Sequence, residues 1–243
     1  MITSNDNEKL KRVRKLGSRK WRDRESAFVS EGEDLLAAGL AAGWKPLDVL
    51  VPAGSEIDGT EVEPHLLDGV STLGSGTRVI AVWTIPAAAD LDTFVIHLHG
   101  VGDPGNVGTI IRTANSLAGA RASLGAGTAD PYSPKAVRAS MGAIFEAQPV
   151  RGDLATLPRP RLGLVADGGA PIDDAIGDLG SVGTLVLGAE REGLPDDVVA
   201  QCDATATIPL REEAESLNVA AAAAIGVQRI VSVAPVLPVD GGD

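Results

Sequence analysis

The chain has 243 residues, of which 44% are apolar, and this composition can bury the core of one large domain or two small ones. The net charge of −12 argues against a phosphate-rich partner, and the single cysteine, Cys202, excludes an internal disulfide. The sequence has no apolar run of about 18 residues and no signal-peptide pattern. These features predict a soluble cytoplasmic protein without a membrane partner.

The charge is distributed unevenly along the chain. Residues 1–25 contain nine of the 21 basic residues and four of the 33 acidic ones, so this segment carries +5 and the remainder −17. A basic segment on an acidic body can steer RNA toward a protein, although a solvated helix without a partner has the same composition. The candidate RNA-binding residues of the segment are Arg14, Lys15, Arg19, Lys20 and Arg22.

The first part of the chain has the pattern of a small α/β domain. Leu10, Val13 and Leu16 are spaced as one apolar face of a helix over 8–15. The other predicted elements are strands at 28–29, 47–51 and 78–83 and a helix at 34–42. The alanine- and proline-containing segment 84–92 is typical of a linker, so we place a domain boundary near residue 88, which gives domains 1–88 and 89–243.

Beyond this linker, predicted strands and helices alternate. Such alternation is typical of a parallel sheet covered by helices on both faces. The predicted strands are 93–99, 120–124, 162–166, 184–187 and 204–208, and the predicted helices are 107–117, 134–141, 195–201 and 217–231.

Three loops that follow predicted strands contain glycine or polar residues, at 102–108, 188–195 and 209–218. Ligands of open α/β sheets bind at the carboxyl ends of the strands, and glycines let a ligand lie against backbone amides. No dinucleotide fingerprint or phosphate-binding loop occurs, and each loop taken alone can be a simple turn. Together they predict a small polar ligand where the loops meet.

Several other polar residues have more than one interpretation. His97 and His99 share one face of a strand, where a hydrogen-bonding role is favoured over metal binding because no third ligand accompanies them. Ser216 can cap the alanine-rich helix that follows it. Asn218 has poor propensity for a position inside that helix, which indicates a role in a site.

Three segments resemble, in order, the motifs of the SpoU (TrmH-type) ribose 2′-O-methyltransferases of the SPOUT superfamily. They are NVGTIIRTA at 106–114, LGAEREGLP at 187–195, and IPL followed by ESLNVA between 208 and 220. DPG at 103–105 and SPKAVRASMGA at 133–143 fit the same pattern. The resemblance covers about residues 93–235, and residues 28–32 are similar to the small substrate-binding domain of many members.

This resemblance implies a trefoil-knotted, parallel-sheet α/β methyltransferase domain, preceded by a small α/β substrate-binding domain. It also implies S-adenosyl-methionine as methyl donor, an RNA substrate (rRNA, slightly favoured, or tRNA) methylated on a ribose 2′-hydroxyl, no metal, and a homodimer with its active site near the subunit interface. The implied catalytic residues are Arg112, Asn106, Glu190, Ser216 and Asn218. The implied donor-binding residues are Leu187, Gly188, Gly193, Ile208, Leu210 and Leu217.

Arg112 has two conceivable roles, as a base or as a clamp on an RNA phosphate. Deprotonating an arginine at neutral pH costs roughly 7 kcal/mol, which favours the clamp and makes Arg112 an RNA-binding residue as well. The alternative function is that of a catalytically silent RNA-binding or ribosome-assembly protein with the same fold. An enzyme that uses another nucleotide is disfavoured because the phosphate-loop and dinucleotide signatures are missing.

Overall fold

The computed structural model describes residues 1–87, 91, 94–211 and 216–233. The chain forms two compact units: unit 1 contains Met1–Ala87 and Asp130–Glu146, and unit 2 contains Ala88–Ala129 and Ala147–Asp243. Parts of the predicted linker 84–92, strand 93–99 and loop 209–218 lie outside the described residues.

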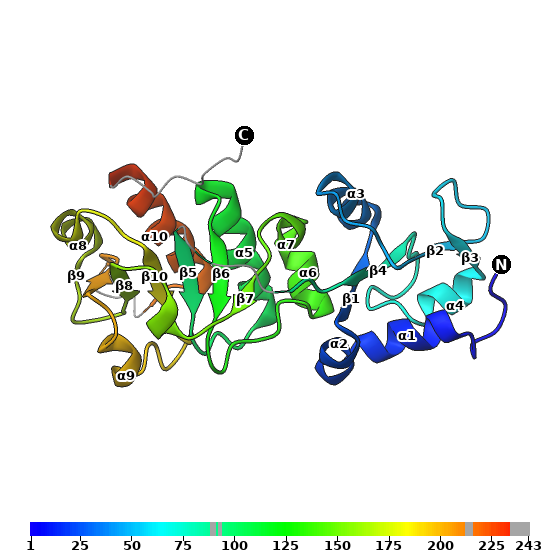
Figure 1. Ribbon diagram of the computed structural model, residues 1–243, viewed down its shortest axis with the longest axis horizontal. Coiled ribbons are helices and arrows are strands. Elements are labelled where there is room, and N and C mark those ends of the chain that lie inside the picture. Colours follow the sequence, from blue (N-terminus) through cyan, green and yellow to red (C-terminus); the bar gives the residue numbers. More distant parts are fainter. Residues whose placement is uncertain (88–90, 92–93, 212–215, 234–243) are drawn as a thin grey trace. The chain divides into compact units, whose positions relative to one another are not determined.

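Unit 1 is built on a four-stranded mixed sheet with the order β1-β4-β2-β3 (Figure 1). Strand β4 is antiparallel to β1 and β2, whereas β2 and β3 are parallel. Its strands are β1 (Ala27–Glu31), β2 (Asp48–Pro52), β3 (Thr60–Val62) and β4 (Ile80–Thr84). Its helices are α1 (Glu8–Leu16), α2 (Arg19–Glu25), α3 (Glu33–Ala41), α4 (Pro64–Asp68), α6 (Pro134–Ser140) and α7 (Ala143–Glu146).

Alternating side chains of the strands separate unit 1 into two cores, because successive residues of a strand point to opposite faces. Val29 and Val82 face a cluster that contains Leu10, Val13 and Leu16, the apolar face predicted for α1. The neighbouring residues Phe28 and Trp83 face a second, aromatic cluster on the other side of the sheet.

Segment 130–146 completes the aromatic core of unit 1, although the sequence-based division had placed it in the second domain. The ring of Phe145 lies 4.9 Å from Trp83 and 5.2 Å from Trp44 between centroids, and Tyr132 lies 4.9 Å from Phe28. The indole of Trp44 also donates a hydrogen bond of 2.9 Å to the Phe145 carbonyl. Burial of these rings explains why the segment packs with unit 1, an association that has no local signal in the sequence.

Unit 2 has a seven-stranded sheet with the order β7-β6-β5-β10-β8-β11-β9, in which all pairs are parallel. Its strands are β5 (Val95–Leu98), β6 (Arg121–Leu124), β7 (Val150–Arg151), β8 (Arg161–Leu164), β9 (Ala170–Pro171), β10 (Thr184–Leu187) and β11 (Ala204–Thr207). Its helices are α5 (Pro104–Ala118), α8 (Ile172–Leu179), α9 (Asp196–Val199), α10 (Val219–Val233) and the 3₁₀ turn η1 (Leu154–Thr156).

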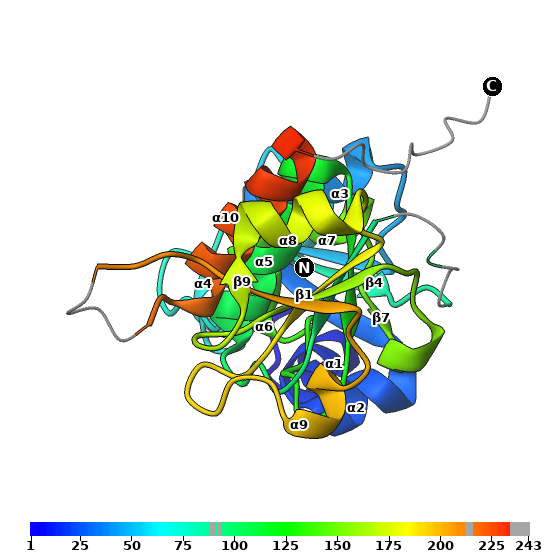
Figure 2. The same cartoon turned by 90° about the vertical axis from the view of Figure 1, so that its left-hand side faces the viewer.

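Helices cover both faces of this sheet, which confirms the predicted parallel α/β architecture. Helix α10 packs against α5, α8 and β10 on one face, and α9 lies on the opposite side in both views (Figures 1 and 2). Val198 of α9 packs with Leu154, Leu157 and Val186. The central strands β5 and β10 are short and completely buried, so their sequences lack the polar alternation of a half-exposed strand.

Several elements of the structure were not predicted from the sequence: α2, α4, α7 and α8, and strands β3, β7 and β9. Most of these are two to five residues long, too short for a periodic pattern. Of the helices within the described ranges, none has the length and hydropathy that a membrane crossing requires.

Candidate functional site

The three loops singled out in the sequence follow β5, β10 and β11. All three strands run in the same direction in the sheet, so these loops lie at its carboxyl edge. Helix α5 begins here earlier than predicted, at Pro104, because Asp103 caps it. The Asp103 carboxylate accepts hydrogen bonds from the amides of Gly105 and Asn106, at 2.7 and 3.1 Å.

A chain of side-chain hydrogen bonds joins the three loops through Asn106, Glu190 and Asn218. Asn218 Nδ2 donates to Asn106 Oδ1 at 3.2 Å, and Asn106 Nδ2 donates to Glu190 Oε1 at 2.9 Å. Asn106 is separated from these partners by 84 and 112 positions in the sequence. Three residues that the sequence assigned to one site are therefore brought into contact by the fold.

The direction of this chain is fixed at its Asn218 end. Asn218 Oδ1 accepts hydrogen bonds from the backbone amides of Ala220 and Ala221, at 2.9 and 3.3 Å, so its Nδ2 is the group that donates to Asn106. Asn106 then accepts with Oδ1 and donates with Nδ2, which requires an acceptor at Glu190. An ionised carboxylate satisfies this requirement with either oxygen.

Asn218 is thus the N-cap of α10, and two sequence-based interpretations were wrong. The sequence placed Asn218 inside a helix that begins at residue 217 and offered Ser216 as the cap. The helix instead begins at Val219, and the Asn218 side chain satisfies amides of the first turn that have no partner within the helix. Asn218 therefore has a structural role in addition to its contact with Asn106.

A cavity of about 780 Å³ opens behind this chain of hydrogen bonds. All six residues predicted for donor binding line it, as do Glu190 and Ser216. These six are Leu187, Gly188, Gly193, Ile208, Leu210 and Leu217. We call this space the first cavity.

The loop after β8 also lines the first cavity, and the sequence analysis did not assign it to the site. Its residues are Val165, Ala166, Asp167 and Gly168, and Thr205 of β11 lies beside them. A signal existed, because Asp167-Gly168-Gly169 directly follows a predicted strand. Asp167 adds a carboxylate to a lining that also contains Glu190 and Asp196.

The β10 loop is held in a tight turn that only glycine permits at two positions. Ala189 and Gly193 exchange backbone hydrogen bonds of 3.1 and 3.0 Å, and Gly193 has a φ of +68°. A Cβ on Gly188 would lie 2.3 Å from the carbonyl carbon of Gly193. The glycines therefore let the loop fold back on itself and present its backbone to the first cavity.

A second cavity, of about 640 Å³, lies on the other side of the β10 loop. It is lined by Gly100, Gly102, Asp103, Asn106, Ala189, Glu190, Arg191, Glu192 and Asn218. Residues 189–192 line both cavities, so the loop forms a common wall between them.

The structure does not bring Arg112 into this group. It lies six residues after Asn106 on α5, its side chain is exposed, and it lines neither cavity. Arg112 makes none of the side-chain hydrogen bonds or ion pairs found among the described residues.

The basic segment of unit 1 contains one residue that is unsuitable for RNA binding. Arg22 is only 3% exposed, and its guanidinium donates to Asp130 Oδ2 at 2.8 and 2.6 Å and to the Leu16 carbonyl at 2.8 Å. The prediction for Arg22 was wrong because a long-range partner, which the sequence does not reveal, withdraws its charge from the surface. Arg14, Lys15, Arg19 and Lys20 are exposed.

His97 and Cys202 have altered acid–base properties that follow from burial. Burial and the neighbouring His99 lower the pKa of His97 to about 4, so its ring is neutral at pH 7, and Nδ1 lies 3.2 Å from Ser123 Oγ. Burial, together with Asp203, raises the pKa of the Cys202 thiol to about 11, which makes the reactive thiolate scarce at neutral pH. Both residues are accounted for by packing and hydrogen bonding.

The fold and the site together define a class of protein: a parallel α/β domain with a ligand cavity at the carboxyl edge of its sheet and a second polar cavity across one loop. A model of the SpoU rRNA Methylase family matches residues 93–228, and one of the MRM3-like substrate binding domain matches residues 7–82. The chain belongs to the SpoU rRNA methylase family, and it is an RNA 2′-O-methyltransferase.

Two relatives match along most of their length. The chain is 30% identical to the 23S rRNA (guanosine(2553)-2′-O)-methyltransferase RlmP of Bacillus subtilis (strain 168), over 94% of this chain and 98% of the relative. It is also 30% identical to the 23S rRNA (uridine(2479)-2′-O)-methyltransferase of Streptomyces viridochromogenes, over 86% and 83%.

Solved structures agree with these relatives. The SpoU methyltransferase AviRb of Streptomyces viridochromogenes, in complex with AdoMet, superposes with a TM-score of 0.81 at 26% identity over 93% of this chain and 97% of AviRb. The AdoMet-bound rRNA methyltransferase of Sinorhizobium meliloti gives a TM-score of 0.83 at 26% identity, over 95% and 97%.

Proposed function

We propose that the protein transfers a methyl group from S-adenosyl-methionine to a ribose 2′-hydroxyl of ribosomal RNA. One observation carries this proposal: the six residues implied for donor binding line one cavity, and Asn106, Glu190 and Asn218 border a second cavity that shares a wall with it. Reactants that occupy these two cavities lie beside the same loop, residues 189–192, which lines both.

The first cavity suits the methyl donor in size and in chemistry. Its volume of about 780 Å³ lies within the usual range of small-molecule sites, and its lining combines apolar and polar groups. Leu187, Ile208 and Leu217 offer apolar contact to an adenine ring. The folded-back loop of Gly188 and Gly193 presents backbone donors and acceptors, and Asp167 offers a carboxylate to a hydroxyl or an amino group.

When bound, the donor would supply a sulfonium methyl group, and the ribose 2′-oxygen would bond to its carbon as the neutral thioether departs in line. The role of the protein is then to hold the ribose hydroxyl at the donor's reacting end and to exclude other orientations. We assign this positioning to Asn106 and Glu190, whose side chains are fixed by Asn218 and border the second cavity. Ser216, which lines the first cavity, is assigned to the same reacting region.

We assign Arg112 to an RNA phosphate. Its exposed guanidinium, with no ion pair in the described part of the chain, is available for a charge-assisted, bidentate contact that orients the ribose. The cost of removing a proton from an arginine makes the role of base the weaker assignment.

Ribosomal RNA is the proposed substrate because the two relatives described above are 23S rRNA methyltransferases. Those relatives act on guanosine and uridine, and a further relative in Streptomyces laurentii acts on adenosine. The ribose is the feature common to these targets. We therefore propose that unit 2 reads the sugar and that the choice of nucleotide depends on the RNA around it.

We further propose a trefoil knot formed by the β10 and β11 loops and a homodimer in the cytoplasm. The knot is supported by the sheet order, in which β10 and β11 flank β8, and by the return of α10 to α5. The dimer is supported by apolar side chains exposed on α5 and α10: Leu117 is 38%, Val231 37% and Val233 47% exposed. Light scattering of the purified protein measures the oligomeric state.

A catalytically silent protein of the same fold is the weaker alternative. Asn106, Glu190 and Asn218 form one hydrogen-bonded group, and Ser216 and Arg112, the other residues implied for catalysis, are both present in the sequence. The six residues implied for donor binding are among those that line the first cavity.

The substitution Arg112→Ala tests the proposal. We expect loss of methyl transfer to rRNA by at least about 100-fold, because one preorganised charged donor contributes this much, while binding of S-adenosyl-homocysteine stays normal. Transfer of tritiated methyl and calorimetry measure the two quantities. Arg151→Ala, which removes another exposed arginine of unit 2, is the matched control. Undiminished turnover in Arg112→Ala would remove Arg112 from the mechanism.

A further inference from the structure

A tryptophan flanked by two cations lies at the junction of α1 and α2 in unit 1. The Nζ atom of Lys15 lies 4.8 Å from the ring centroid of Trp21, and Cζ of Arg24 lies 5.0 Å from it. Trp21 is partly exposed, whereas Lys15 and Arg24 are exposed. Trp83, by contrast, is fully buried in the aromatic core.

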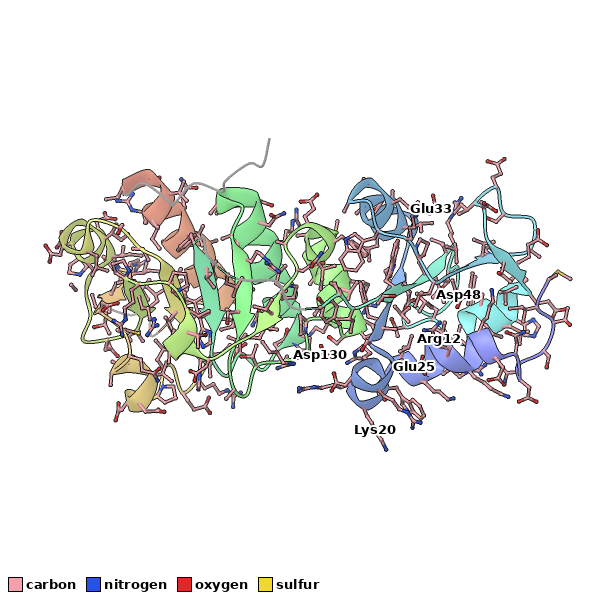
Figure 3. The ribbon with its side chains drawn as sticks, viewed as in Figure 1. Arg12, Lys20, Glu25, Glu33, Asp48 and Asp130 are labelled. Atoms are coloured by element: carbon pink, nitrogen blue, oxygen red, sulfur yellow. The ribbon has the colours of Figure 1, made fainter. Side chains whose placement is uncertain are left out.

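Most other cations of residues 1–25 are neutralised by nearby carboxylates. Lys9 and Arg12 pair with Asp48, and Arg12 also pairs with Glu25. Lys11, Arg19 and Arg22 pair with Glu8, Asp23 and Asp130, respectively. Figure 3 shows the contrast: Arg12 lies among Glu25 and Asp48, whereas Lys20 extends away from α2.

Lys15, Lys20 and Arg24 form no ion pair with any described residue, and all three are exposed. Arg14, which is hydrogen-bonded to Asn5, also has no ion pair with a described residue. Lys15 and Arg24 lie against the Trp21 ring, and Lys20 precedes Trp21 in the sequence. We call Lys15, Lys20, Trp21 and Arg24 the Trp21 cluster.

The rest of unit 1 has the opposite charge. Exposed carboxylates lie at the start of α3 and in the region of β2 and β3. They are Glu33, Asp34, Glu56, Asp58 and Glu61. A polyanion is repelled from those surfaces and attracted to the Trp21 cluster. Within unit 1, charge alone therefore favours one docking face.

The chemistry of the cluster matches unpaired RNA better than duplex RNA. Unpaired bases stack on aromatic rings and on the planar guanidinium of arginine, whereas duplex RNA is contacted mainly through its phosphates and 2′-hydroxyls. The Arg24 guanidinium carbon lies 5.0 Å from the centroid of the Trp21 indole, so both groups on which a base can stack occur together, and Lys15 and Lys20 are exposed cations that can meet phosphates. The alternative is that these contacts only hold α1 against α2. That purpose would need a single cation–π contact, and it would not explain Lys20.

We propose that the Trp21 cluster is a binding site for a single-stranded segment of the RNA substrate. An unpaired base stacks on the Trp21–Arg24 pair, and Lys15 and Lys20 contact the adjoining phosphates. This inference rests on the proposed function for the nature of the substrate. It assigns RNA recognition to four named residues of unit 1, separate from the methyl-transfer site of unit 2.

The test uses the full-length protein and a fluorescent single-stranded oligouridylate of about 12 nucleotides. Trp21→Ala is expected to weaken binding roughly ten-fold, the effect of one lost base stack, and Trp21→Phe to retain most of the affinity. Lys20→Gln should weaken binding and reduce the slope of log K against log salt by about 0.7, the value for one phosphate contact. Lys45→Gln, which removes an exposed lysine elsewhere in unit 1, should change neither quantity.

Several results would overturn the inference. One is equal affinity of the wild type and Trp21→Ala for the single strand; another is an equal loss for Lys20→Gln and Lys45→Gln. A matched duplex, bound as tightly as the single strand and equally weakened by Trp21→Ala, would also contradict the stacking role. Circular dichroism confirms folding, and Trp21→Phe provides a second variant if Trp21→Ala unfolds.

Calorimetry with S-adenosyl-homocysteine separates this inference from the proposed function. If the wild type binds this product analogue and methylates rRNA while Trp21→Ala binds RNA normally, only the Trp21 cluster fails. If the wild type does not bind the analogue, the proposed function fails whatever the RNA affinities are.

Discussion

The pair Arg22–Asp130 in unit 1 and the chain Asn106–Glu190–Asn218 in unit 2 are both polar contacts between distant parts of the sequence. The first spans 108 positions and the second 84 and 112. The arginine of the pair is 3% exposed, whereas the contacts of the chain are exposed and border a cavity. Because it is buried, the Arg22–Asp130 pair contributes to the stability of the fold. Because their contacts are exposed, the side chains of Asn106, Glu190 and Asn218 remain available to a substrate.

This difference explains why residue type alone misassigned Arg22. An arginine in a basic segment and an arginine in a buried ion pair look the same in the sequence. Removing one partner of a buried pair leaves an uncompensated charge, so its effect is on stability. Changing an exposed polar group beside a cavity affects ligand contacts first.

The largest effect is expected from Arg22→Ala, which leaves the mostly buried Asp130 carboxylate, 11% exposed, without its cation. We expect a loss of about 3–5 kcal/mol in the free energy of unfolding, measured by urea titration. Arg19→Ala is the matched control, because its ion pair with Asp23 is exposed and contributes at most about 1 kcal/mol. Weakened RNA binding in Arg22→Ala at unchanged stability would restore Arg22 to the RNA-binding surface.

A second effect follows from the lowered pKa of buried His97, about 4 against 6.5 in the unfolded chain. Between these values the unfolded state binds more protons, so stability is complete above pH 6.5 and declines as the pH falls toward 4. Between pH 7 and 4, the wild type should lose about 3 kcal/mol more than His97→Gln. Urea titrations at several pH values measure this, and parallel curves would show that His97 is not held neutral.

The smallest effect is expected from substitutions of Asn218, which both caps α10 and donates a hydrogen bond to Asn106. Asn218→Asp keeps an oxygen to cap α10 but cannot donate to Asn106, so kcat/KM should fall about ten-fold while the melting temperature is retained. Asn218→Ala should also lose the cap, at about 1 kcal/mol of stability. Full activity in Asn218→Asp would show that the contact with Asn106 does not position the substrate.

The sequence predicted much of unit 2 because its information is local. Buried strands, the loops after them and the six residues of the first cavity all lie within short motifs whose order matches a known family. The start of α10 was misplaced by two residues, since both Ser216 and Asn218 can cap a helix and only the backbone positions decide between them.

The parts that could not be predicted depend on contacts between distant residues. Segment 130–146 belongs to unit 1 because Tyr132 and Phe145 complete its aromatic core. The partner of Arg22 lies in the same segment. The exposed position of Arg112, outside both cavities, likewise follows from the helical register of α5 rather than from the motif that contains it.

The central claim is that the protein transfers a methyl group to one ribose of ribosomal RNA and that the two cavities of unit 2 bind the reactants. Mapping 2′-O-methyl positions in total RNA from cells with and without the protein tests it most directly. We predict that a ribose 2′-O-methyl group in rRNA disappears with the protein and returns with the wild type, but not with Arg112→Ala. Unchanged 2′-O-methylation of rRNA, or a loss confined to tRNA, would contradict the account.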